Sequence, residues 1–182
     1  MKRPYQMRKA QKDDLAALHE VFREARARIA ALGIDQWQDG APTDETILKD
    51  IERGLGNAFL QDGRVAGYAM FATKPEETYR QLDGKWEGAE EDSVVIHRVA
   101  VADETAGTGL GGGILREAER FCRERGRHFL RIDTHRGNAV MRGFLEHLGY
   151  ETRGNVTYAH IKTGDPVRVC YEKKLKELPP GK

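Results

Sequence analysis

Hydrophobic residues along this chain fall either into short runs or into stripes at helical spacing. The runs predict strands near residues 5–9, 57–61, 64–73, 94–101, 128–134, 151–161 and 167–175. The stripes predict one helix capped by Asp13 and a second that starts at Thr43 or Asp44 and runs toward Arg53. A third helix is predicted to begin inside the glycines between 107 and 113, and a fourth covers 138–148. Strands and helices therefore alternate, as is typical of an α/β protein.

The segment VVIHRVAVADETAGTGLGGGIL, residues 94–115, joins a strand to a helix through a loop rich in glycine. The strand is nearly continuous in β-branched residues, which is typical of a strand covered on both faces. Five glycines then open the helix: Gly107, Gly109, Gly111, Gly112 and Gly113. Because the first N–H groups of a helix lack internal partners and glycine has no Cβ, the segment is suited to bind a phosphate or pyrophosphate.

Two familiar phosphate-binding motifs fit this segment poorly. A Walker loop needs Lys and then Ser or Thr after its last glycine, and Ile114 and Leu115 stand there instead. The spacing GxGxxG of dinucleotide-binding proteins is present from Gly107, with an acidic residue about 20 positions further on. However, five residues separate Val101 from Gly107, and too little chain follows for a second nucleotide-binding half. A dinucleotide-dependent oxidoreductase is therefore the less favoured alternative.

The segment resembles the coenzyme A loop of the GNAT acetyltransferase superfamily, whose signature is Arg or Gln, two residues, Gly, one residue, then Gly or Ala. In this chain the frame runs from Ala106 to Gly111, and Ala106 replaces the usual Arg or Gln. Residues 131–150, RIDTHRGNAVMRGFLEHLGY, resemble the next strand and helix of that family, with Asn138 eleven residues before Gly149. The resemblance covers residues 94–150 well and the rest loosely.

The resemblance implies a mixed central sheet flanked by helices, in a single domain over residues 1–182, and acetyl-CoA as cosubstrate without a metal ion. A backbone N–H on the strand before the loop would stabilise the oxyanion, and Asn138 would cap its helix while holding the pantetheine arm. The implied acetyl-CoA-binding residues are Val99, Ala100, Val101, Gly107, Thr108, Gly109, Leu110, Gly111, Gly112 and Asn138.

Two side chains are candidates for the general base that deprotonates an amine acceptor. Some family members carry an acidic residue five positions before the helix asparagine, and Asp133 stands there. His97 is the other candidate, since imidazole takes up protons near neutral pH. Asp133 could instead form an ion pair with the nearby Arg131 or Arg136 or cap a loop, and His97 could be a hydrogen-bonded core residue. Many family members protonate the leaving thiolate with a tyrosine where this chain has Leu145. Tyr158 or a water molecule could replace it.

The composition of the chain limits the classes of partner to be expected. The chain has 182 residues, of which 32% are charged, and a net charge of +1, which argues against nucleic acid or a membrane surface as partner. The first residues contain no apolar signal segment, and no run approaches the roughly 20 apolar residues of a membrane span. A cytoplasmic location is expected. Cys122 and Cys170 are isolated and predict buried, inert thiols.

The expected activity is direct transfer of an acetyl group to a primary amine of a small molecule or a peptide, in a ternary complex. A non-catalytic sensor of acyl-CoA is the alternative, because Ala106 and Leu145 depart from the family pattern. The acidic stretch 75–92 would favour a cationic acceptor if it borders the cleft, but could equally be a solvated loop. Trp37 and Trp86 could line an acceptor pocket or anchor loops. A homodimer is left open.

Overall fold

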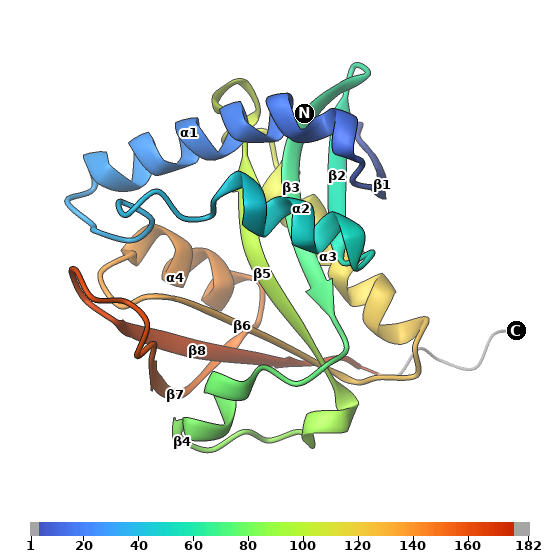
Figure 1. Cartoon of the computed structure of the whole chain (residues 1–182). Helices are drawn as coiled ribbons and strands as arrows, with labels where there is room; N and C mark the ends of the chain where they lie inside the picture. Colours follow the sequence, from blue (N-terminus) through green and yellow to red (C-terminus); the bar gives the residue numbers. More distant parts are fainter. Residues whose placement is uncertain (1–3, 177–182) are drawn as a thin grey trace, which may run out of the picture.

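The computed structural model describes residues 4–176, and its strands form one eight-stranded sheet in the order β1-β2-β3-β5-β6-β8-β7-β4 (Figure 1). The strands are β1 (Gln6–Lys9), β2 (Gly56–Gln61), β3 (Arg64–Ala72), β4 (Asp83–Gly84), β5 (Ser93–Val101), β6 (Phe129–His135), β7 (Glu151–Thr157) and β8 (Val167–Lys174). Only the β5–β6 pair is parallel among the described strands. The sheet is thus mixed, as expected, and it is not the parallel sheet of a dinucleotide-binding fold.

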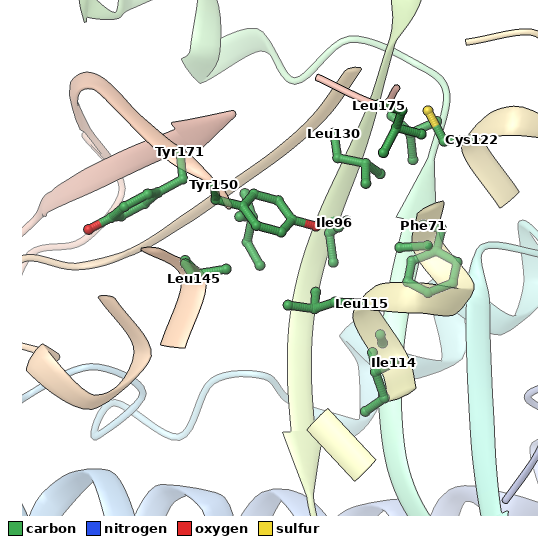
Figure 2. Close-up of a cluster of buried hydrophobic side chains, with 14 of the residues drawn as sticks. Phe71, Ile96, Ile114, Leu115, Cys122, Leu130, Leu145, Tyr150, Tyr171 and Leu175 are labelled. Atoms are coloured by element: carbon green, nitrogen blue, oxygen red, sulfur yellow. The ribbon is translucent and has the colours of Figure 1, made fainter. Parts of the chain in front are cut away.

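Four α-helices in the described part of the chain cover the two faces of this sheet. They are α1 (Leu15–Ala31), α2 (Asp44–Glu52), α3 (Leu110–Arg123) and α4 (Ala139–His147). Apolar residues of α1 and α2, including Phe22 and Ile47, pack with Tyr68 in one core cluster. Residues of α3 and α4, including Ile114 and Leu145, pack in a second cluster that also holds residues of β3, β5 and β6 (Figure 2). The two helix pairs therefore lie on opposite faces of the sheet.

Most element boundaries lie within one residue of the sequence-based prediction, but the residue before α1 and the end of β7 were predicted wrongly. Asp14, not Asp13, precedes α1, and its carboxylate accepts two hydrogen bonds from Arg8 at 2.6 and 2.7 Å. The strand expected over 151–161 ends at Thr157. The second helix begins at Asp44, one of the two predicted starts, and Thr43 is its N-cap, whose hydroxyl accepts the Thr46 N–H at 3.2 Å. None of the helices described between residues 4 and 176 is both long and apolar enough to cross a membrane.

The parallel strands β5 and β6 separate halfway along their length. They are paired only from Ser93 and Phe129 to Ile96 and Ile132, after which β5 stays with β3 and β6 stays with β8. A β-bulge lies in β5 at this point, where Arg98 has a positive φ of 56°. The split opens a crevice at the carboxyl ends of the two strands, where α/β proteins commonly bind ligands.

Ion pairing holds the bulge in place. The guanidinium of Arg98 donates to both oxygens of Asp50 on α2, at 2.7 Å each. One of these oxygens also accepts the Tyr68 hydroxyl at 2.9 Å. The bulge that bends β5 away from β6 is therefore tied to α2 and β3 by a bidentate pair, whose geometry is specific.

Candidate active site

A cavity of about 1000 Å³ lies at the split between β5 and β6. Its walls come from the C-terminal end of α1, the α1–α2 loop, α2, β3 and the segment after it, β5, β6, the starts of α3 and α4, the β7–β8 loop and the start of β8. The predicted site residues on its wall are His97, Val99, Ala100, Val101, Gly111, Asp133 and Asn138. The other predicted residues belong to the glycine loop beside it. The structure thus brings both candidate bases, the candidate oxyanion strand and the helix asparagine to one cavity.

The glycine loop presents free backbone donors. Gly107 and Gly109 have positive φ angles of 77° and 91°, and α3 begins at Leu110, inside the glycines as predicted. Within residues 4–176, no protein oxygen accepts the N–H groups of Leu110, Gly111 or Gly112. A Cβ on Gly107 would meet nothing within 4 Å. Open space beside unpartnered N–H groups at the positive end of a helix suits a pyrophosphate.

Other residues of the loop serve packing. A Cβ on Gly113 would lie 2.5 Å from the ring of Tyr5, so this glycine allows α3 to approach the N-terminal segment closely. The side chain of Leu110 is buried in the core, which leaves only its backbone for a ligand. The hydroxyl of Thr108 donates to the carbonyl of Thr105 at 2.7 Å and so tightens the turn before the helix.

Asn138 is the N-cap of α4, as predicted. Its side-chain oxygen accepts the N–H of Met141 at 3.0 Å, and the residue is 7% exposed and lies on the cavity wall. Since the oxygen is used by the cap, the amide nitrogen is the donor left for a ligand.

A polar cluster surrounds the first residues beyond the split. His97 directly follows the last paired residue of β5, and Asp133 directly follows that of β6. The Nδ1 of His97 lies 3.7 Å from Oδ1 of Asp133, and its Nε2 is hydrogen-bonded to Glu76 at 3.1 Å. Two phenols donate to the same oxygen of Asp133, Tyr79 at 2.6 Å and Tyr158 at 3.1 Å. The two candidate bases are thus neighbours in one network.

The ion pair suggested as an alternative for Asp133 does not form. Arg131 pairs instead with Glu172 at 3.0 Å, and Arg136 pairs with Asp165. The carboxylate of Asp133, whose side chain is 10% exposed, is stabilised by phenols and not by an arginine. Apart from the His97 ring, no basic side chain of the described residues is hydrogen-bonded to it or ion-paired with it.

The neighbours of Asp133 keep defined protonation states near neutral pH. Burial, followed by the charge of Asp133, raises the pKa of Tyr79 and of Tyr158 far above the ordinary phenol value. Both phenols therefore remain protonated donors. The hydrogen bond with His97 is the main cause that lowers the pKa of Glu76. Glu76 consequently remains a carboxylate at the mouth of the cluster.

Leu145, at the position of the family's tyrosine, lies in the hydrophobic core. It is fully buried near Tyr150 and Tyr171 and is not on the cavity wall (Figure 2). Phe144, its neighbour on α4, lines the cavity instead. Tyr158, which was considered as a replacement acid, does reach the cavity.

Of the tryptophans and cysteines considered in the sequence, one lies on the cavity wall and the others are structural. Trp37 lies on the cavity wall and packs edge-on against Phe22, whereas Trp86 anchors its loop by donating to the carbonyl of Tyr79 at 3.0 Å. Cys122 and Cys170 are buried as predicted, and burial raises the pKa of the Cys122 thiol to about 12. In the described part of the chain, no group of three His, Cys, Asp or Glu side chains has the geometry of a metal site.

Sequence reasoning missed three residues of this site. Tyr79 carried no motif, Glu76 was considered only as part of the acidic stretch, and Arg168 was not singled out. The rest of the acidic stretch mostly forms surface ion pairs, such as those of Arg80 with Glu77 and Glu90. No local pattern distinguishes Glu76 from these neighbours, because its role depends on contact with a strand 21 residues away.

Comparison with known proteins agrees with this geometry. The family model described as the acetyltransferase (GNAT) family matches residues 15–150. The uncharacterized N-acetyltransferase YesJ of Bacillus subtilis (strain 168) is 32% identical over 108 residues, so the match spans 59% of this chain and 59% of that relative.

Solved structures match over more of the chain. A GNAT-family acetyltransferase of Streptococcus agalactiae has a TM-score of 0.82 and 31% identity, covering 97% of this chain and 99% of that chain. The PaiA N-acetyltransferase of Thermoplasma acidophilum, solved in complex with coenzyme A, shares the fold with a TM-score of 0.69 and 22% identity, over 94% of this chain and 99% of that chain. From the family match, which covers most of its length, and from the shared fold, we conclude that this chain belongs to the GNAT family of acetyltransferases.

Proposed function

We propose that this protein is an acetyl-CoA-dependent N-acetyltransferase that transfers the acetyl group directly to a primary amine in a ternary complex. The observation that carries this proposal is the position of His97 and Asp133 at the split between β5 and β6. This split lies beside the free N–H groups at the start of α3. An anion-binding loop and a proton-accepting cluster therefore face one cavity.

The chain offers suitable groups to each part of acetyl-CoA, which supplies the thioester. The N–H groups of Gly107, Gly109 and the first turn of α3 would hold the pyrophosphate, since no side chain is needed there. The amide nitrogen of Asn138 would hold the pantetheine arm. Ala106 removes one side-chain contact relative to the family signature, so we expect weaker binding but not its loss.

His97 and Asp133 would accept the proton of the amine. Either Asp133 accepts it, directly or through water, or His97 does so through Nδ1 while its Nε2 remains bonded to Glu76. Deprotonation frees the lone pair of nitrogen for attack on the thioester carbonyl. The two phenols hold Asp133 in position, which limits the geometry in which it meets an acceptor.

The remaining steps need an oxyanion donor and a proton for the departing thiolate. Beyond Ile96, β5 has no β6 partner, so N–H groups of Val99 to Val101 on that side are open to the cavity. When the C–S bond breaks, Tyr158 or a water molecule would protonate the thiolate. Tyr158 is a candidate for this step because it lies on the cavity wall.

A sensor that binds acyl-CoA without turnover is the second candidate, favoured by the burial of Leu145 where the family has an acid. Two measurements separate the candidates. Acetyl-CoA at ~100 times its dissociation constant should stabilise the protein by about 2.7 kcal/mol in a thermal-shift assay, with no effect of NAD. Thiol release with a pooled amine library then distinguishes an enzyme from a sensor. Stabilisation by NAD alone would overturn both candidates.

A further inference from the structure

Arg168 is a buried cation on the cavity wall that no carboxylate of the described residues neutralises. It is 6% exposed, and its Nη1 donates to two backbone carbonyls, those of Asp165 at 2.7 Å and Val167 at 3.0 Å. Among residues 4–176 it forms no ion pair, whereas Arg98 and Arg28 on the same wall pair with Asp50 and Asp103. Arg53, which is also on this wall and forms no ion pair within the described residues, is exposed to solvent. The remaining nitrogens of this largely buried guanidinium are not among the fully buried polar atoms without a partner, so they are open to a ligand. An anion bound there would pair with a charge that is otherwise mostly removed from water.

Two of the acidic residues on this wall, Asp35 and Asp165, are engaged with other groups. Asp35 accepts the N–H of Asp165 at 2.7 Å and lies 2.9 Å from Nε2 of His135. The side chain of Asp165 accepts the N–H of Val167 at 3.0 Å and pairs with Arg136. The Asp35 carboxylate joins the α1–α2 loop to the β7–β8 loop, and the Asp165 carboxylate joins the β7–β8 loop to Arg136 after β6. The Nε and Nη2 atoms of Arg168 have no acceptor among the described residues.

Arg168 lies on the same face of the sheet as the candidate bases. In the antiparallel register of β6 with β8, Asp133 is opposite Cys170 and His135 is opposite Arg168. Residues two apart share a face, so Arg168 and Asp133 point to the same side, about 7 Å apart along the strands. Val169, which points to the other side, packs with α3 and α4. Arg168 therefore faces the acceptor side of the cavity and not the glycine loop.

The charges of this cavity are arranged as a dipole. Glu76 and Asp133 form the negative end beside His97, where the amine must be deprotonated, and Arg168 forms the positive end. We infer that the acceptor is a primary amine that also carries an anionic group, a carboxylate or a phosphate, which the fork of Arg168 binds. This inference rests on the proposed acetyltransferase function. A polyamine would bring a second cation towards Arg168 and is therefore disfavoured.

Matched acceptors test the inference on the unaltered protein. Initial rates of thiol release would be measured for amino acids, β-alanine and dipeptides, each against its C-terminal amide, with aminomethylphosphonate and 1,4-diaminobutane as further arms. We expect kcat/KM about 10- to 100-fold higher for an acid than for its amide. The amino group of each C-terminal amide is less basic than that of the matching acid and loses its proton more easily. This difference alone would favour the amide, so a higher kcat/KM for the acid cannot come from it. Preference for the phosphonate would identify a phosphate as the anion.

Variants of Arg168 test whether this residue is the cause. Arg168→Gln should lower kcat/KM for acids about 10- to 100-fold, mostly through KM, and leave the rate with amides and the affinity for acetyl-CoA within about twofold. Arg168→Lys should retain part of the preference, because it keeps the charge but not the fork. The matched control is Arg136→Gln, which removes an arginine that is largely exposed and pairs with Asp165. It should leave the preference intact.

Several results would overturn the inference. They are equal use of acids and amides, a preference for the diamine, equal loss of both acceptor types in Arg168→Gln, or loss of acetyl-CoA affinity in that variant. If Arg168→Gln does not fold, the acid and amide comparison on the parent protein decides. If no amine releases thiol, the acetyltransferase proposal fails by itself. Calorimetry of the same acid and amide pairs, with coenzyme A present, then still shows whether the cavity selects an anionic amine.

Discussion

Replacing Asp133 by asparagine is the most direct test of the proposed base. The substitution removes the negative charge and the ability to accept a proton but keeps an oxygen at the position of Oδ1. If Asp133 takes the amine proton directly or through water, turnover should fall by ~10²-fold or more, which corresponds to about 2.7 kcal/mol of transition-state stabilisation. The acidic limb of the pH profile should change, and the affinity for acetyl-CoA should not.

The structure indicates that this variant stays folded. In Asp133→Asn the amide oxygen can still accept from Tyr79 and Tyr158, which donate to the carboxylate at 2.6 and 3.1 Å. What is lost is the charge-assisted part of these bonds, about 1 kcal/mol each, offset by the lower cost of burying a neutral group. The free energy of unfolding should therefore change by no more than about 2 kcal/mol, which circular dichroism and a melting curve can verify.

The assay is thiol release at saturating acetyl-CoA over a range of pH, for the parent, Asp133→Asn, His97→Gln and the exposed control Asp83→Asn. Tyr79→Phe tests positioning apart from proton transfer, since it removes one donor to Asp133, keeps the ring and leaves the proposed acid Tyr158 in place. Full turnover in Asp133→Asn with an unchanged pH profile would refute the role of Asp133 and assign the base to His97. Equal loss in Asp133→Asn and Asp83→Asn would show that the effect is not specific to the site.

Three further predictions concern the glycine loop, the core and the stability at low pH. Gly111→Val should abolish binding of acetyl-CoA in calorimetry, because the valine side chain would fill space needed by the phosphates at the first turn of α3. The protein should stay folded, since Gly111 has an ordinary helical φ. Affinity equal to the parent's would place the phosphates elsewhere. Leu145→Tyr should lower the melting temperature and not raise turnover, because the phenol would be overpacked and unpartnered in a filled core; a large rate gain would contradict this. The Arg8 guanidinium lowers the pKa of Asp14 below its ordinary value of 3.8, so this carboxyl contributes stability above that pH and loses it as pH falls through the lower folded value. Asp14→Asn should therefore lower the free energy of unfolding in urea by roughly 1 to 2 kcal/mol at pH 7, and this loss should shrink towards pH 2. Asp13→Asn, at an exposed position, should leave the free energy of unfolding unchanged. A loss that does not depend on pH would show that charge is not the cause.

The amino-acid sequence alone determined those features that depend on residues close together in the chain. Helical and strand spacing predicted most elements, the run of glycines predicted where α3 begins, and the cap at Asn138 follows from its own position before a helix. These features depend on backbone propensity and on hydrogen bonds between residues a few positions apart, which is why they can be read without the fold. The resemblance to the GNAT family rested on this same local segment, and the family match confirmed it.

Only the tertiary structure decided how the chemical groups meet. From the sequence, Asp133 could be a general base or a partner in an ion pair. The structure shows that two phenols donate to it, from residues that are 25 and 54 positions away in the sequence. His97 and Asp133 become neighbours because β5 and β6 part directly before them, and strand pairing between distant segments is not encoded in either strand. The lack of an ion pair between Arg168 and the described carboxylates likewise depends on how distant segments pack together. Charges that stand within a few residues of one another in the sequence can lie on opposite faces of a sheet, so which cation remains unpaired is settled by packing.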